Sequence, residues 1–220
     1  MSDLLVVYGA GGHGKVVAEI LFASGRRVAG FLDDNPALNG SSVLDLPVFA
    51  AAEWLQWNPR AYVALGIGNN AQRENASHQV RKFGGTLVVA IHPTAAVARS
   101  AKIAEGVVIM PGAALNPDCQ VGEGAIINTG AIVEHDVRIG RYAHLAPRCV
   151  TGGAASVGDF AQFGMGAVVL AGKQIGQNAV IGAGAVVIDD IPDNVTASGV
   201  PARIHSQKRQ TRRRAVRLRG

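Results

Sequence analysis

Cysteine, aromatic residues and long apolar runs are all scarce in this 220-residue chain, which has 2 cysteines and 5% aromatic residues. Cys119 and Cys149 form no Cys-x-x-Cys pair, which argues against a disulfide framework or a metal-thiolate site. No apolar run reaches the length of a membrane span, and the N-terminus lacks the basic flank of a signal peptide. We therefore expect a cytoplasmic protein without a bound metal.

Basic charge is confined to the C-terminal end. The net charge is +5, but residues 206–220 hold seven Lys and Arg residues and no acid; subtracting these seven leaves −2 for the rest. No aromatic residue is interleaved with them and no DNA-reading helix is apparent, so nucleic-acid binding is not expected. We predict a solvated, disordered basic tail over 206–220, with membrane contact through anionic lipid, acidic sugar polymers or a neighbouring subunit as alternatives.

An apolar residue recurs at every sixth position from Val97 to Val187, and only Thr151 interrupts the series. Neither an α-helix nor an ordinary strand gives that spacing, whereas a β-helix does, because each coil has three short parallel strands with one buried residue each. Small residues two places earlier, the cysteines among them, fit tight corners. The pattern predicts a left-handed parallel β-helix over 89–205. We expect the interruption at Thr151 to mark a corner rebuilt as an oxyanion site.

Residues 1–88 indicate an α/β, Rossmann-like half domain that binds a nucleotide. A buried strand, Leu4 to Tyr8, leads into the glycine-rich segment 9–15 and then an amphipathic helix. Such glycines let the backbone approach a phosphate at the helix N-terminus. The candidate phosphate-binding residues are Gly11, Gly12, His13 and Gly14. A purely structural turn is the alternative.

The next two strands each end in polar residues. The segment Val28 to Leu32 ends in Asp33 and Asp34, where an acid can bind ribose hydroxyls. The segment Ala61 to Ile67 is followed by Asn69, which either caps the next helix or contacts the ligand. Because this domain is half of a full dinucleotide fold, it has room for one nucleotide and not for a nicotinamide half.

Two histidines, His135 and His144, lie on the coil outside the buried register. His135 is flanked by Glu134 and Asp136, and a neighbouring carboxylate can fix the imidazole tautomer. A coil of about 18 residues places Gly153 beside His135 on the next coil, about 4.8 Å away. A base and a bare backbone N–H would then be neighbours. A surface histidine among acids is the alternative.

His144 follows His135 by half a coil, so within one chain the two face different sides. They can converge only across a subunit interface. This spacing predicts a homotrimer whose active sites lie between subunits.

Several motifs together resemble the bacterial sugar acyltransferases of the sialic acid O-acetyltransferase type, especially the N-acetyltransferases of nucleotide-linked 4-amino-4,6-dideoxyhexoses such as bacillosamine and perosamine. They are Gly-Ala-Gly-Gly-His-Gly, Phe-Leu-Asp-Asp, Ile-Gly-Asn-Asn, Ile-Asn-Thr, Glu-His-Asp, His144 and Gly199-Val200-Pro201-Ala202. The resemblance implies that His135 is the general base, that Asp136 orients it and that the Gly153 N–H binds the thioester oxygen. It implies acetyl-CoA contacts from His144, Met165 and Ala183. The front loop, His13, Asp33 and Asp34 would hold the nucleotide, and Asn69 and Asn128 complete the candidate set.

The implied reaction is acetyl transfer from acetyl-CoA to the C4 amine of a nucleotide-linked sugar, for surface polysaccharide or glycan synthesis, with no metal. O-acetylation of sialic acid or another sugar is one alternative. A zinc carbonic anhydrase on this coil would need three convergent histidines, and only His135 and His144 are available. A nucleotide-binding trimeric module without catalysis is the remaining alternative.

Overall fold

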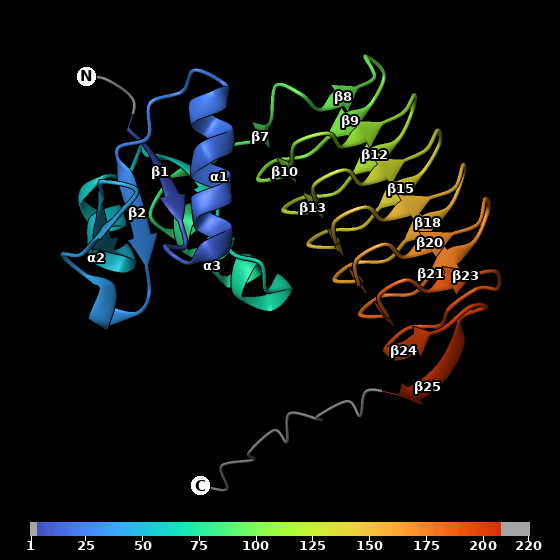
Figure 1. The fold of residues 1–220 in the computed structure, drawn as a ribbon. Helices are drawn as coiled ribbons and strands as arrows, with labels where there is room; N and C mark the ends of the chain where they lie inside the picture. Colours follow the sequence, from blue (N-terminus) through green and yellow to red (C-terminus); the bar gives the residue numbers. More distant parts are fainter. Residues whose placement is uncertain (1–3, 208–220) are drawn as a thin grey trace, which may run out of the picture.

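The structure, a computed structural model, describes residues 4–207. An N-terminal α/β domain lies beside a three-sided coil of short strands (Figure 1). Residues 208–220, which hold nearly all of the predicted basic tail, lie outside the described residues. Within residues 4–207, no helix is both long and apolar enough to cross a membrane.

The N-terminal domain is built on a six-stranded sheet in the order β3-β4-β2-β1-β5-β6. Its strands are β1 (Leu5–Tyr8), β2 (Gly30–Asp33), β3 (Ser42–Val43), β4 (Leu46–Ala50), β5 (Tyr62–Leu65) and β6 (Thr86–Leu87). All pair in parallel except the β3–β4 hairpin, which the sequence pattern did not indicate. A short 3-10 helix, η1 (Pro36–Leu38), precedes that hairpin.

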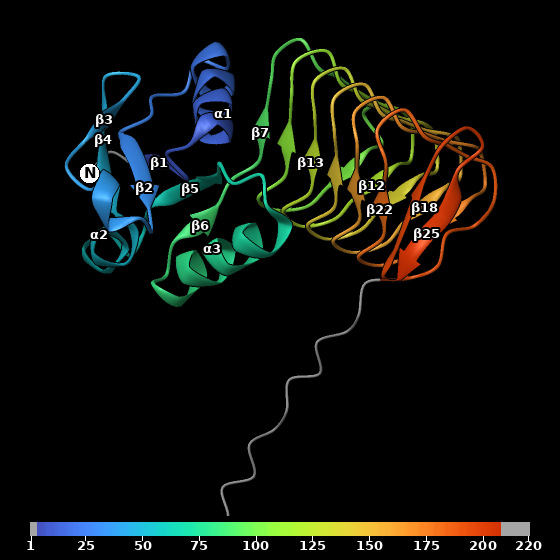
Figure 2. The same cartoon turned by 60° about the horizontal axis from the view of Figure 1, so that its bottom comes forward.

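Helices cover both faces of this sheet. One apolar cluster joins α1 (Gly12–Ala23) to one face, through Val17, Ile20 and Leu21. A second cluster joins α2 (Ala51–Trp57) and α3 (Asn70–Lys82) to the opposite face. Figure 2 shows α1 and α3 on opposite sides of the sheet. The result is a three-layer α/β domain, as expected.

The coil has three faces, which we name for what they contact or carry. The docking face comprises β7 (Ala90–Ile91), β10 (Val108–Ile109), β13 (Ile126–Ile127), β16 (His144–Leu145), β19 (Gln162–Phe163), β22 (Val180–Ile181), β24 (Val195–Ser198) and β25 (Arg203–Gln207). The apolar face comprises β8 (Ala96–Val97), β11 (Ala114–Leu115), β14 (Ile132–Val133), β17 (Val150–Thr151), β20 (Val168–Val169) and β23 (Val186–Val187). The polar face comprises β9 (Lys102–Ile103), β12 (Gln120–Val121), β15 (Arg138–Ile139), β18 (Ser156–Val157) and β21 (Gln174–Ile175).

The strand pairing confirms the predicted parallel β-helix. Strands one coil apart pair in parallel register, for example Ile126 with His144 and His144 with Gln162. The second residue of each two-residue strand points into a continuous apolar core. Cys119 and Cys149 are buried in that core as free thiols.

The expectation that Thr151 marks a rebuilt corner was wrong, because the coil keeps its regular pairing there. Thr151 is fully buried in the normal register and pairs with Val133 and Val169. Its hydroxyl donates to the Ile132 carbonyl oxygen at 3.3 Å, so the buried polar group has a partner. A threonine is therefore accommodated without any change of the corner that follows.

Glycines follow the buried positions because successive coils approach each other closely. A β-carbon added at Gly122 would lie 2.8 Å from the backbone nitrogen of Arg141 on the next coil. No side chain fits between these backbones. The requirement comes from contact between coils, since Gly122 does not have a positive φ angle.

The N-terminal domain packs on the docking face. Val108 and Ile126 occupy outward positions of their strands, yet both are fully buried and belong to the same apolar cluster as Val17, Ile20 and Leu21 of α1. The chain passes from one domain to the other between Leu87 at the end of β6 and Ala90 at the start of β7. The two domains thus share an apolar interface.

Candidate functional site

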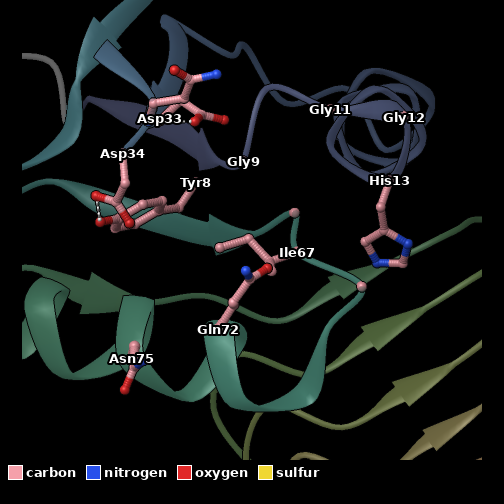
Figure 3. A pocket seen from close by; sticks show the side chains of 13 residues that line it. Tyr8, Gly9, Gly11, Gly12, His13, Asp33, Asp34, Ile67, Gln72 and Asn75 are labelled. Carbon is pink, nitrogen blue, oxygen red and sulfur yellow. Dashed lines mark hydrogen bonds between the residues drawn. The ribbon is translucent and has the colours of Figure 1, made fainter.

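A cavity of about 600 Å³ opens at the carboxyl ends of β1, β2 and β5. Figure 3 shows its lining residues, which are Tyr8, Gly9, Gly11, Gly12, His13, Asp33, Asp34, Asn35, Gly66, Ile67, Gly68, Gln72 and Asn75. Ligands of parallel α/β sheets bind at this edge, and the volume lies in the range of small-molecule sites. We call this cavity the nucleotide pocket.

The predicted phosphate loop forms one wall of the nucleotide pocket. Helix α1 begins at Gly12, with Gly11 as its N-cap, and has no acidic residue in its first turn. Its first backbone N–H groups therefore remain available for an anion. A β-carbon at Gly11 or Gly12 would have no neighbour within 4 Å, so both face open space.

Gly14 has a different environment. It is buried and does not line the pocket, and a β-carbon there would collide with the Gly9 carbonyl oxygen. Gly14 therefore lets the first turn of α1 approach the loop that precedes it.

Asp33 and Asp34 both line the pocket, but each already has a partner. The Asp33 carboxylate accepts hydrogen bonds from the backbone N–H groups of Ala10 at 2.8 Å and Asn35 at 2.9 Å. Asp34 Oδ1 accepts from the Tyr8 hydroxyl at 2.7 Å (Figure 3). Burial, followed by the bond to Asp34, raises the pKa of Tyr8, so its hydroxyl stays protonated as a donor. Asp33 thus braces the glycine-rich loop, and one oxygen of Asp34 holds the Tyr8 hydroxyl.

The two asparagines of the candidate set lie outside the nucleotide pocket. Asn69 is the N-cap of α3, and its side chain accepts from the Gln72 N–H at 3.0 Å. Of the two roles considered for Asn69, the structure therefore shows the helix cap. Asn128 lies on the β-helix, where its amide nitrogen is 3.0 Å from His144 Nε2.

His13 and His144 meet at the interface between the domains. Their ring centroids are 6.1 Å apart in an edge-to-face arrangement. Burial, and then the positive charge of Arg73, lower the pKa of each ring to about 4, so both are neutral at pH 7. Within residues 4–207, His13 Nε2 is buried without a hydrogen-bond partner. The phosphate loop and the outward-facing histidine of β16 are therefore in direct contact.

A second group, His135 with Asp136 and Gly153, lies at the corner between the apolar and polar faces. His135 Nδ1 is 2.8 Å from an Asp136 carboxylate oxygen, and its side chain is 62% exposed. The hydrogen bond to Asp136, with the charges of Asp136 and Glu134, raises the pKa of His135. A β-carbon at Gly153 would lie 2.6 Å from His135 Nε2, so the ring stands directly over this glycine.

Met165 and Ala183 lie at a different corner, between the docking and apolar faces. They follow β19 and β22, one coil apart, and the Gly184 N–H donates to the Met165 carbonyl oxygen at 2.8 Å. Neither backbone N–H of this pair has an acceptor among the described residues. Both residues are exposed.

Most of the predicted site residues thus form two groups in one chain, while Met165 and Ala183 lie at a separate corner and Gly14 and Asn69 have structural roles. Gly11, Gly12, His13, Asp33, Asp34, Asn128 and His144 lie in or next to the nucleotide pocket, on the docking side. The His135 group lies at the far edge of the apolar face. Among residues 4–207, no cluster of three His, Cys, Asp or Glu side chains is arranged to hold a metal ion.

Sequence reasoning missed several pocket residues, namely Tyr8, Gln72 and Asn75. Tyr8 ends β1, and Gln72 and Asn75 lie in the first two turns of α3. Their polar character at the carboxyl edge of the sheet was the available signal. It was weak, since polar residues in first helical turns are common for capping alone.

Two protein families match this chain. The PglD N-terminal domain family matches residues 4–80, and the bacterial transferase hexapeptide (six repeats) family matches residues 100–134 and 118–153. A structure of a histidine variant of perosamine N-acetyltransferase from Caulobacter crescentus, in complex with CoA and GDP-perosamine, is similar over 94% of this chain and 99% of that protein, with 41% identity and a TM-score of 0.89. The chain belongs to the perosamine and bacillosamine N-acetyltransferase family.

Other members of this family agree with the assignment. The acetyltransferase domain of PglB from Neisseria gonorrhoeae, in complex with acetyl coenzyme A, is 34% identical, with a TM-score of 0.86 over 93% of this chain and 100% of that one. The UDP-N-acetylbacillosamine N-acetyltransferase of Bacillus subtilis is 41% identical over 113 residues. That match spans 50% of this chain and 52% of the relative.

Proposed function

We propose that this protein is an acetyl-CoA-dependent N-acetyltransferase. Its substrate would be the C4 amine of a nucleotide-linked 4-amino-4,6-dideoxy sugar destined for a surface polysaccharide or glycan. The observation that carries the proposal is the His135–Asp136 pair standing over Gly153, in a chain with a separate nucleotide-sized pocket. Relatives that bind CoA with GDP-perosamine, or acetyl coenzyme A, support the choice of both substrates.

His135 is the general base. With its Nδ1 proton donated to Asp136, its Nε2 lone pair remains free to accept a proton. His135 takes a proton from the sugar amine as the amine attacks the thioester carbonyl carbon. The C–N bond forms and the C–S bond breaks. The proton that His135 has accepted passes to the CoA sulfur, which leaves as the thiol. A positioned base of this kind contributes about 10² to 10⁴ in rate.

Gly153 supplies the electrostatic part of the mechanism. Its backbone N–H has no acceptor among residues 4–207, and the residue lies directly beneath the ring of the base. That N–H donates to the thioester oxygen as negative charge develops there. Glycine is required because any side chain would occupy the space between base and donor.

The nucleotide pocket holds the sugar's nucleotide. The N-terminus of α1 binds the diphosphate, and the free oxygen of Asp34 accepts from a ribose hydroxyl or a base N–H.

A homotrimer would bring the two groups of residues together. The outward positions of the apolar face are Ala96, Ala114, Ile132, Val150, Val168 and Val186, whereas those of the polar face are Lys102, Gln120, Arg138, Ser156 and Gln174. Packing three apolar faces around a threefold axis buries this surface. In such a ring, one edge of the face meets the opposite edge of the neighbouring subunit.

Each active site would then be composite. One subunit contributes His135, Asp136 and Gly153, and its neighbour contributes the nucleotide pocket, Asn128 and His144. The free N–H groups of Met165 and Ala183, on that neighbour, are available for the amide oxygens of pantetheine. His144, neutral and held near Asn128, borders the same edge and can contact acetyl-CoA.

The proposal is tested by mixing the purified protein with acetyl-CoA and a panel of acceptors, and following thiol release. The panel contains UDP-, dTDP- and GDP-linked 4-amino-4,6-dideoxy sugars, their 4-hydroxy counterparts and free sialic acid. Transfer to an amino sugar alone is the expected result. Preference for a hydroxyl acceptor favours O-acetylation instead. If the protein binds the nucleotide but transfers acetyl to none of the acceptors, it is a nucleotide-binding module without catalysis.

A further inference from the structure

Arg73, in the first turn of α3, is a charged side chain with no exposure to solvent. It lies where the N-terminal domain meets the β-helix. Burying a guanidinium without compensation is costly, so its hydrogen bonds indicate what holds it there.

All five N–H donors of Arg73 have acceptors. Nε donates to the Gly124 carbonyl oxygen at 2.6 Å. One terminal nitrogen donates to the carbonyl oxygens of Ile67 and Gly68, both at 3.0 Å. The other donates to Asn70 Oδ1 at 2.9 Å and to the Tyr142 carbonyl oxygen at 2.8 Å. No carboxylate is among these partners, and the geometry uses the full capacity of a guanidinium.

These acceptors come from two parts of the chain that are far apart in sequence. Ile67 and Gly68 form the edge of the nucleotide pocket, directly after β5. Gly124 and Tyr142 lie one coil apart at the corner between the polar and docking faces. A single side chain therefore joins the pocket edge to two coils of the β-helix.

The same pocket edge borders the histidine contact. A β-carbon at Gly68 would lie 3.9 Å from the His13 ring, and His13 packs against His144 of β16. A shift of the 67–68 segment would move one wall of the pocket and release this contact between the domains.

We propose that Arg73 is a positioning residue for acetyl transfer, which holds the Ile67–Gly68 edge of the nucleotide pocket at a fixed place on the β-helix. The inference rests on the proposed function, because the bound sugar amine must reach a base carried by the coil. A misplacement of about 1 Å at a reacting centre costs up to about 10²-fold in rate. Arg73 touches no reacting atom and acts through the pocket backbone.

Arg81 is a matched control on the same helix. It also binds the corner between the polar and docking faces, through ion pairs with Glu105 at 3.0 Å and Glu123 at 2.6 Å. Its side chain is 41% exposed, and it does not line the nucleotide pocket. Removing Arg81 therefore weakens the same interface without releasing the pocket edge.

The test compares Arg73→Gln, Arg73→Lys and Arg81→Gln in the full-length protein. We expect Arg73→Gln to lower kcat by up to about 10²-fold and to raise KM for the nucleotide sugar about tenfold, with KM for acetyl-CoA unchanged within about twofold. Arg73→Lys should fall between Arg73→Gln and wild type, because three donors replace five. Arg81→Gln should change neither KM. Amide hydrogen exchange at residues 66–69 should be fastest in Arg73→Gln, intermediate in Arg73→Lys and unchanged in Arg81→Gln.

Equal exchange at residues 66–69 in wild type and Arg73→Gln, or a lower unfolding temperature with kcat and KM for the nucleotide sugar both unchanged, would overturn the inference and leave Arg73 a purely structural residue. If Arg73→Gln does not fold, the same two readouts apply to Arg73→Lys. Exchange needs no turnover, so it tests Arg73 even if wild type transfers no acetyl group. The absence of transfer would count against the proposed function alone.

Discussion

The imidazole of His135 stands over the backbone of Gly153, its neighbour one coil further along the chain. A β-carbon at Gly153 would lie 2.6 Å from Nε2 and 2.7 Å from Cε1 of the ring. The two residues are joined by the pairing of β14 with β17, and the Ala154 N–H donates to the His135 carbonyl oxygen at 2.9 Å. The base and the backbone N–H donor therefore follow two strands that are hydrogen-bonded to each other.

Gly153→Ala should lower kcat by about 10²-fold, because its methyl group displaces the base from the position that the proton transfer requires. The ring is exposed and free to move aside, so the unfolding temperature should change little. Steady-state kinetics and a thermal melt check both parts. A variant with wild-type turnover would show that the space above Gly153 is not used.

His135→Asn should lower turnover by about 10² to 10⁴ while acetyl-CoA binding stays nearly intact, since the base is lost and no binding group is removed. His78→Asn is the matched control, because His78 is an exposed histidine on α3. Turnover and calorimetric binding of acetyl-CoA are measured for both. Equal turnover in the two variants would exclude His135 as the base.

Asp136→Asn should move the acid limb of the kcat/KM profile to lower pH. The Asp136 carboxylate stabilises the imidazolium and raises the pKa of His135, so the base is neutral and active only above that raised value. Without the carboxylate, the ring loses its proton at lower pH. The plateau rate at high pH should fall, because the base is weaker and its tautomer is no longer fixed. If the acid limb does not move, the titrating residue that causes it is not His135.

Gly11→Val and Gly14→Ala lie only three residues apart, but the first should affect substrate binding and the second should affect stability. Gly11 faces open space, so valine there should raise KM for the nucleotide sugar with the fold intact. Gly14 contacts the Gly9 carbonyl, so alanine there should lower the free energy of unfolding by about 1–3 kcal/mol. That cost exceeds the gain of up to about 1 kcal/mol from replacing a helical glycine. Denaturant unfolding and initial-rate kinetics separate the two outcomes.

Inactive His135→Asn and impaired Gly11→Val proteins, unfolded together and reassembled, should regain activity above either parent. If sites are composite, mixed trimers contain sites with a native nucleotide pocket from one chain and a native His135 from another. Light scattering or native mass spectrometry verifies that mixed trimers form. No gain in verified mixtures would place each site within one chain.

The sequence by itself determined the coil. Its sixfold apolar period specified which residue of each strand is buried, and the repeat of about 18 residues placed Gly153 beside His135. These relationships depend only on local geometry, because each coil rests on the one before it. For the same reason the predicted strand, loop and helix of the phosphate site appear where expected, at Leu5–Tyr8 and Gly12–Ala23.

Only the tertiary structure decided how the two domains meet. The contact of His13 with His144 and the bonds from Arg73 to Gly124 and Tyr142 join residues more than 50 positions apart. They depend on which coil face receives the N-terminal domain, and the sixfold period of buried residues is the same on all three faces. Burial of Val108 and Ile126 on one of them, beneath α1, selects that face, because apolar surface gains most from leaving water.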